Sequence, residues 1–257
     1  MFRMVFDTET TDLNKCFCYD LGYLVFDDED GNIIIKKHFV IEQIWHNLEL
    51  FQSAYYGEKR PAYIQLMRSR KATMEKWGYV MQEMIRDVKK FGITDIYAYN
   101  AAFDEKVFEY NCDWFKTQNP LDTLAIHDIW GYASEIITRT SDYKKFCDDN
   151  SRYTDSGNYS GSAESVYQFL TQDPAFVEAH MGLMDAEIEC HILQKCVEKG
   201  LEYDKDYKVV KILDRVTTTP YSILVNGTVI HEGEYIKKSV YANKFRFTEP
   251  QQTETEP

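Results

Sequence analysis

The chain of 257 residues lacks two features that would place it in or across a membrane. It has no uninterrupted apolar run of about 18 residues, the length at which a membrane-spanning helix becomes a candidate. Its N-terminus shows no basic region followed by an apolar stretch, which argues against a secretory signal. We therefore expect no membrane partner and a cytoplasmic location, and the compact size is compatible with a bacterial enzyme or a phage enzyme in its host's cytoplasm.

Paired cysteines are missing as well. The six cysteines form no CxxC pair and no zinc-ribbon spacing. This argues against a structural zinc site. Free thiols in a reducing compartment are the simpler interpretation.

Positive charge is scarce, with a net charge of −13. Phosphate contacts dominate nucleic-acid affinity, so this balance argues against a protein that coats nucleic acid tightly. Two features weaken the objection. Acids at a metal site are neutralised when the metal binds, and Lys59, Arg60, Arg68, Arg70 and Lys71 form a local basic stretch. We expect modest, salt-sensitive binding.

With 44% hydrophobic residues, the chain can bury the core of one large domain, or of a domain with a small appendage. Period-two and helical patterns predict a three-stranded meander followed by helices and one further strand. The expected strands are 2–9, 20–27, 33–41 and 95–99, and the expected helices 77–91, 103–114, 121–132, 164–170 and 182–199. The segment 46–75 is less regular, and the polar segment 141–162 is expected to be a long loop. This order predicts an α/β protein with a mixed sheet.

The character of the chain changes after residue 202. Two apolar runs flank Asn226 and Gly227, which is a strong signal for a two-residue hairpin. We expect a main domain over 1–202, a small β-rich extension over 203–249 and a disordered tail over 250–257.

The first expected strand ends with two acids, Asp7 and Glu9. Being two positions apart, they point to the same face of the strand. That face is a core face, where unpaired carboxylates are costly. A divalent metal ion between them would remove the cost.

Three further segments carry candidate acids. Asp104 lies in the first turn of a helix that follows Asn100, where a carboxylate is favoured but is often only a cap. His180 and Asp185 cannot share a helix face at this spacing, but they converge if His180 precedes the helix, as Gly182 allows. Asp122 is better interpreted as a cap or a support for the sheet than as a ligand.

Taken in order, residues 6–10, 100–104 and 180–185 resemble the three exonuclease motifs of the DEDDh family. This family includes proofreading subunits of bacterial replicative polymerases and related phage and oligonucleotide-degrading nucleases. The resemblance covers about residues 1–200, and 121–124 also looks like a segment of these enzymes. It implies a ribonuclease H-like fold, with three antiparallel strands plus parallel strands flanked by helices. The stretch that usually ends in a His-Gly turn before the second motif is absent, and residues 46–76 stand in its place. The extension after residue 202 has no counterpart in the family.

The resemblance implies a metal-dependent 3′→5′ exonuclease that releases nucleoside 5′-monophosphates. Two Mg²⁺ or Mn²⁺ ions, about 4 Å apart, would clamp the attacking and departing oxygens. Asp7 would bridge the ions, Glu9 and Asp185 would complete the tighter site, and Asp104 would help to hold the second ion. His180 would be the general base.

Substrate contacts are less evident in the sequence. Thr8, Thr10, Asn100 and Phe103 are candidates from their places in the motifs. Aromatic residues could stack on unpaired bases. Phe103, Phe108 and the tyrosines at 55, 56 and 63 are of this kind, although packing in the core or at its rim is the better interpretation for each.

Three interpretations stay open. The leading one is an exonuclease acting on single-stranded or frayed 3′ ends, with DNA favoured by the wording of the motifs and RNA as the alternative. The second is a non-catalytic accessory subunit on the same scaffold, bound to a polymerase or replication factor through 203–249. The third is a structural metal site, which would rarely need a His beside four acids.

Overall fold

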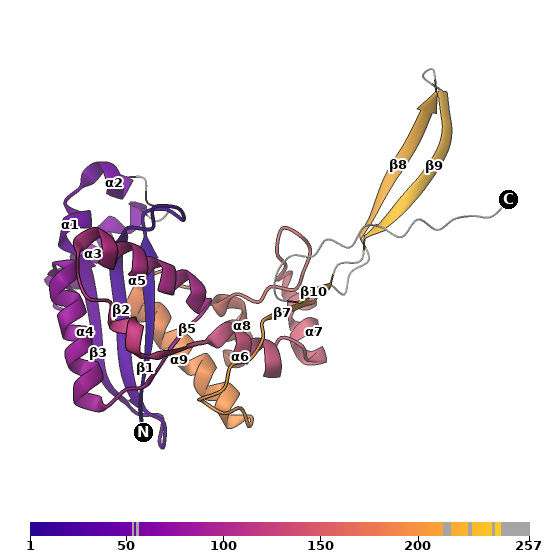
Figure 1. Ribbon diagram of the computed structural model, residues 1–257. Helices are drawn as coiled ribbons and strands as arrows, with labels where there is room; N and C mark the ends of the chain where they lie inside the picture. The colour runs from indigo at the N-terminus through magenta and orange to yellow at the C-terminus, as the bar shows by residue number, and fades with distance from the viewer. Residues whose placement is uncertain (53, 55–56, 213–216, 226–227, 238–239, 243–257) are drawn as a thin grey trace.

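The structure is a computed structural model, described here over residues 1–52, 54, 57–212, 217–225, 228–237 and 240–242. Its centre is a mixed sheet with the order β4-β3-β2-β1-β5-β6 (Figure 1). Strands β1, β2 and β3 form the antiparallel meander, whereas β5 and β6 continue parallel to β1 and β4 lies parallel to β3. The predicted mixed α/β sheet is therefore confirmed. The bounds are β1 (Phe2–Thr10), β2 (Cys18–Asp27), β3 (Ile33–Ile41), β4 (Thr73–Glu75), β5 (Asp95–Ala98) and β6 (Ala125–Asp128).

Helices cover both faces of this sheet (Figure 1). One core contains Met4 and Phe6 of β1 together with residues of α4 and α5, and the other contains Val5 with residues of α6, α8 and α9. Since side chains alternate along a strand, Asp7 and Glu9 share the face of Val5, toward α9. The helices are α1 (Glu42–Trp45), α2 (Leu48–Gln52), α3 (Arg60–Arg68), α4 (Trp77–Phe91), α5 (Ala101–Phe115), α6 (Ile129–Ile136), α7 (Ser141–Asn150), α8 (Ala163–Thr171) and α9 (Gly182–Glu198), with the short 3₁₀ turns η1 (Gly57–Lys59) and η2 (Pro120–Thr123).

The structure corrects the prediction of one helix over 121–132. The segment contains η2, then strand β6, then the start of α6. Asn119 caps η2 by accepting from the backbone N–H of Leu121, and Asp128 caps α6 by accepting from the N–H of Trp130. Two caps so close together divide the segment into short elements.

The expected long loop over 141–162 is also wrong in its first half, which forms α7. Thr140 caps this helix, accepting from the N–H of Tyr143 at 3.2 Å. Tyr143 and Cys147 are its buried residues, at i and i+4 on one face of an otherwise polar helix. In the irregular segment 46–75, the structure contains α2, η1, α3 and β4.

The C-terminal part contains two small antiparallel pairs. Strand β7 (Val210–Ile212) pairs with β10 (Val240–Ala242), and β8 (Thr217–Val225) pairs with β9 (Thr228–Lys237). The β8–β9 pair projects away from the central sheet (Figure 1). The two residues of the expected turn, 226 and 227, and the tail 250–257 lie outside the described residues. In the described part of the chain, no helix combines the length and the apolar character that crossing a membrane requires.

Candidate active site

Two glycines let helix α9 begin directly against the sheet. A Cβ at Gly22 of β2 would overlap the backbone of Leu183, and a Cβ at Gly182 would lie 2.6 Å from the backbone N of Gly22. These overlaps exclude any larger residue unless the backbone moves. The close approach carries Asp185 to the ends of β1 and β2, where Asp7 and Glu9 lie.

His180 stands just before α9, as the sequence predicts. Its backbone is left-handed, with φ of 49°, which turns the chain sharply before the helix begins at Gly182. The carboxylate of Asp185 then caps this turn, since Oδ2 accepts from the N–H of Met181 at 2.8 Å. The break needed for His180 and Asp185 to converge therefore occurs at His180 itself.

Asp104 is tied to β1 from the first turn of α5. Its Oδ1 accepts from the backbone N–H of Thr8 at 3.1 Å and from Thr8 Oγ1 at 2.6 Å. Asn100, which precedes α5, has a left-handed backbone with φ of 64°, and its N–H donates to Asp128. Thr8 thus contacts a candidate ligand directly.

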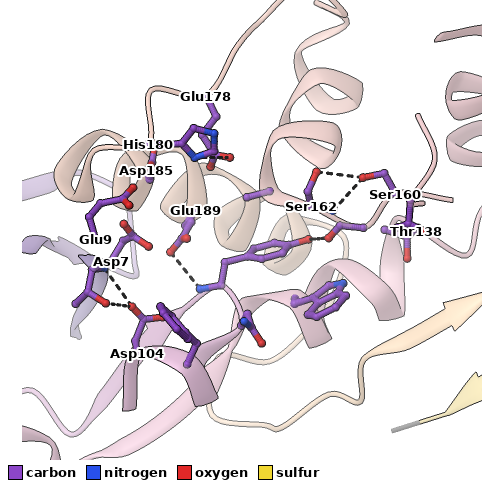
Figure 2. A pocket seen from close by; sticks show the side chains of 18 of the residues that line it. Asp7, Glu9, Asp104, Thr138, Ser160, Ser162, Glu178, His180, Asp185 and Glu189 are labelled. Atoms are coloured by element: carbon purple, nitrogen blue, oxygen red, sulfur yellow. Dashed lines mark hydrogen bonds and ion pairs between the residues drawn. The ribbon is translucent and has the colours of Figure 1, made fainter. Parts of the chain in front are cut away.

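These groups line one cavity of about 470 Å³ (Figure 2). All five predicted motif residues belong to its wall: Asp7, Glu9, Asp104, His180 and Asp185. Among the predicted substrate residues, Thr8, Asn100 and Phe103 also line it, whereas Thr10 is not part of the wall and donates to the carbonyl of Asp12.

The donor set fits a divalent cation. Potential ligand atoms of Glu9, His180 and Asp185 lie within 4.8 Å of one another. Asp185 is only 4% exposed, and its Oδ1 has no hydrogen-bond partner among the described residues. Buried carboxylate oxygens without a partner are the hard ligands that Mg²⁺ and Mn²⁺ prefer.

Comparison with known proteins rests on the fold. No protein-family model matches the chain, and no curated protein matches its sequence. Solved structures do match. The complex described as "3′-end specific recognition of histone mRNA stem-loop by 3′-exonuclease" aligns with a TM-score of 0.55 at 10% identity, over 89% of each chain. A full-length 3′-exonuclease aligns with a TM-score of 0.54 at 10% identity, over 93% of each chain.

A third match is the nuclease domain of 3′hExo, a DEDDh family member, bound to rAMP. It aligns with a TM-score of 0.52 at 10% identity, over 79% of this chain and 94% of that chain. This chain has the DEDDh exonuclease fold. The resemblance that the sequence motifs predicted is confirmed at the level of the fold.

On this DEDDh fold, the acids of the cavity have strongly shifted acidities. Burial, with neighbouring carboxylates as a further cause, raises the pKa of Asp185 to about 8 and that of Glu9 to about 9. Burial also raises the pKa of Asp104 to about 7, although the hydrogen bonds from Thr8 oppose the shift. The pKa of Asp7 rises well above its usual range, through burial and then the charge of Glu189. Without a cation, these carboxyl groups therefore keep their protons to a higher pH than exposed carboxyl groups do.

The pKa of His180 is shifted down, not up. Burial and the nearby charge of Lys59 lower the pKa of its imidazole. Lys59 comes from η1, in the segment 46–76, and its ammonium donates to the carbonyl of Ala179, next to His180. A neutral imidazole is the form that can accept a proton.

Two acids of the cavity were missed by the sequence reasoning, Glu178 and Glu189. Glu189 follows Asp185 by four residues, so helical spacing alone places it on the same face. Glu178 lies with its Oε2 3.8 Å from His180 Nδ1, and burial raises its pKa to about 7. Nothing in the sequence distinguishes Glu178 from a solvated loop acid.

Several other aromatic and acidic residues do not line the cavity. Phe108 is fully buried in the core, and Tyr63 is fully buried with its hydroxyl donating to Asp20. Asp20, completely buried, also accepts from the N–H of Gly182 at 2.9 Å. Asp122 is exposed on η2, away from the cavity wall. Tyr55 and Tyr56 lie outside the described residues.

Proposed function

We propose that the protein is a metal-dependent 3′→5′ exonuclease that hydrolyses phosphodiester bonds of nucleic acid. One observation carries the proposal. Four carboxylates and a histidine from three distant segments meet in one cavity, in the order of the DEDDh motifs and on the DEDDh fold. No single segment would bring this chemistry together.

The four motif acids, Asp7, Glu9, Asp104 and Asp185, would hold two divalent cations, Mg²⁺ or Mn²⁺. When bound, such ions stabilise negative charge on the reacting phosphate and its leaving oxygen. The chain's own contribution is to fix the ligands. Thr8 orients Asp104 by two hydrogen bonds, and the N–H of Met181 orients Asp185.

His180 would accept a proton from the attacking water. Its lowered pKa supports this role, because a base must be unprotonated at the working pH. Its left-handed backbone, before the helix rather than within it, leaves the imidazole at the edge of the cavity (Figure 2). The same proton would then be available for release to solvent when a nucleoside 5′-monophosphate departs.

The remaining wall of the cavity suits the 3′-terminal nucleotide. Phe103, Tyr99 and Trp130 line it, and Tyr99 and Trp130 are stacked with ring centroids 6.3 Å apart. Aromatic faces of this kind can stack on unpaired bases without selecting a sequence. Thr8 and Asn100 complete the candidate contacts, and Thr10 would act from outside the wall.

The sequence motifs favour single-stranded DNA or frayed 3′ ends as substrate, whereas the similar structures carry names that mention an mRNA stem-loop and rAMP. We propose that the substrate is DNA, and the experiment below compares DNA with RNA. We also propose that residues 1–202 form the nuclease domain and that 203–249, which include the β8–β9 pair, are available to a polymerase or replication partner.

The test uses 3′-labelled and 5′-labelled single strands of DNA and RNA, with Mg²⁺, with Mn²⁺ and with EDTA. We expect mononucleotides released from the 3′ end only when metal is present. His180→Ala should lower turnover by about 10²–10⁴-fold while metal binding, followed by calorimetry, persists. His191→Ala is the matched control, because His191 lies on α9 against Tyr167 and does not line the cavity.

Two results would contradict the proposal. Binding of strands without degradation would favour an accessory subunit on this fold. Unchanged turnover in His180→Ala would remove His180 from the mechanism.

A further inference from the structure

Glu189 is a buried acid that the DEDDh motifs do not include. It lies on α9 one turn after Asp185 and is only 3% exposed. It lines the same cavity as Asp7, Glu9, Asp104 and Asp185 (Figure 2). Its carboxylate is therefore part of the wall from which the motif acids project.

Among the described residues, Glu189 has one hydrogen-bond donor and forms no ion pair. Its Oε2 accepts from the backbone N–H of Tyr99 at 3.1 Å. Within the described residues, no Lys, Arg or His forms an ion pair with it; the salt bridges of this helix belong to Glu187 and Lys195. A buried carboxylate with a single neutral donor is poorly compensated.

The neighbouring acid Glu187 shows what an ordinary helix acid does here. Its side chain is 40% exposed, and it pairs with Lys36 of β3 at 2.9 Å. Glu189, two residues later, turns inward to the four motif acids. Burial, followed by the charges of Asp104 and Asp185, raises the pKa of Glu189 well above its usual range. An apolar residue at this position would avoid that repulsion, so the acid needs another reason to be there.

We propose that Glu189 is a fifth carboxylate of the metal site, holding the divalent cation from the side of the cavity next to Tyr99. This inference rests on the metal site of the proposed function but not on nuclease activity. Even a group that only supports metal ligands typically contributes about 10–100-fold to metal affinity, so a carboxylate that holds the cation should contribute at least about tenfold. The hydrogen bond from Tyr99 would orient the carboxylate toward the cavity.

The test is Glu189→Gln with Mn²⁺ alone as the probe, followed by isothermal titration calorimetry and by electron paramagnetic resonance of free Mn²⁺. Glutamine keeps the shape and a carbonyl oxygen that can accept from the N–H of Tyr99. The hydrogen bond between α9 and the residue after β5 is therefore preserved while the charge is lost. We expect Mn²⁺ to bind about tenfold more weakly. Glu187→Gln, on the same helix but facing solvent, should bind as the wild type does.

Wild-type Mn²⁺ affinity in Glu189→Gln would overturn the inference and leave Glu189 as a structural tie. If circular dichroism shows that Glu189→Gln does not fold, Glu189→Asp decides instead. It keeps the charge but withdraws the oxygens by one methylene, so several-fold weaker binding supports the inference and wild-type binding overturns it. Because Mn²⁺ binding is measured without substrate, this result can be interpreted even if the exonuclease assay shows no activity. A wild-type protein that binds no Mn²⁺ would refute both proposals.

Discussion

Both ends of strand β1 face carboxylates, but in the described part of the chain the ion pairs with these acids lie at the N-terminal end, whereas Lys59 acts on the cavity acid Glu9 only through its charge. Arg3, 4% exposed, contacts Asp28 through Nε at 2.8 Å and pairs with Asp204 through Nη1. Nearby, His127 lies between Asp95 and Asp206, at 2.8 and 2.9 Å. At the other end of β1, Asp7 and Glu9 face the cavity and form no ion pair within the described residues.

The pKa values of the acids differ between the two ends of β1 in the same way. Burial alone would raise the pKa of Asp28, but hydrogen bonds from the N-terminal ammonium and Arg3 outweigh it and lower the pKa. The same balance lowers the pKa of Asp95, through Thr94 and His127. In the cavity, burial prevails and pKa values rise. We infer that the protein neutralises the acids that hold the fold together and leaves the cavity acids for a cation from solution.

The largest expected effect comes from removing the protein's own cation. Arg3→Ala would leave Asp28 partly buried without its guanidinium, and we expect a loss of about 3 kcal/mol in the free energy of unfolding. Urea denaturation measures it. Arg86→Ala is the control, since Arg86 is 63% exposed and its ion pair within the described residues is with Glu83 on its own helix. This change should cost less than about 1 kcal/mol. Equal losses of stability in Arg3→Ala and Arg86→Ala would show that Arg3 does not compensate a buried acid.

The sequence reveals the cavity end of β1 better than the N-terminal end. Asp7 and Glu9 are two positions apart on a strand that begins with an apolar run, so their shared face can be predicted. His180 and Asp185 can converge only across a break, and the break is present. Arg3, in contrast, finds its partners 25 and 201 residues away, and no local pattern marks such contacts.

The misses have the same cause. The burial of Asp20 is not visible in the sequence, because its partner Tyr63 lies 43 residues later. Strand β6 has only four residues, so its pattern merges with the helix that follows. Helical spacing places Glu189 on the face of Asp185, but only the fold shows that its side chain is buried. Local periodicity predicts faces, whereas only the fold determines which charges are compensated.

The second-largest expected effect is the stabilisation that a bound cation gives at the cavity end of β1. At about thirty times its dissociation constant, Mg²⁺ or Mn²⁺ should raise the free energy of unfolding by about 2 kcal/mol, because it binds the folded state alone. Thermal denaturation with and without EDTA measures this shift. Asp185→Asn removes a buried ligand with an unpartnered oxygen and should abolish most of it. A thermal midpoint that ignores millimolar metal would contradict the metal site.

A smaller effect concerns pH. The raised pKa values of Asp104, Asp185 and Glu9 mean that the metal-free fold holds extra protons, a stabilisation complete below about pH 4 and lost as pH rises through about 7 to 9. Asp28 and Asp95, with lowered pKa values, stay ionised across this range, and their contribution is lost only in acid.

Cations compete with those protons at the cavity end only. From pH 6 to pH 8 we expect Mn²⁺ affinity to rise about tenfold, or about 1.4 kcal/mol. Calorimetry at both pH values, with buffers of different ionisation enthalpy, would also count the protons released. A Mn²⁺ affinity that falls as the pH rises would contradict the raised pKa values of the cavity acids.

The smallest expected effect tests an acid that lies beside the cavity yet is compensated by the protein. Asp20 accepts from Tyr63 Oη at 2.6 Å and from Gly182 N–H at 2.9 Å, and its Oδ1 lies 2.8 Å from His38 Nε2. Tyr63→Phe removes one of these partners, so we expect a loss of about 1 kcal/mol in stability with Mn²⁺ affinity unchanged. Tyr79→Phe, 45% exposed, is the control for losing a hydroxyl. If Tyr63→Phe instead changed Mn²⁺ affinity as much as Asp185→Asn, Asp20 would belong with the cavity acids, and the division between acids that the protein compensates and acids that await a cation would have to be redrawn around the start of α9.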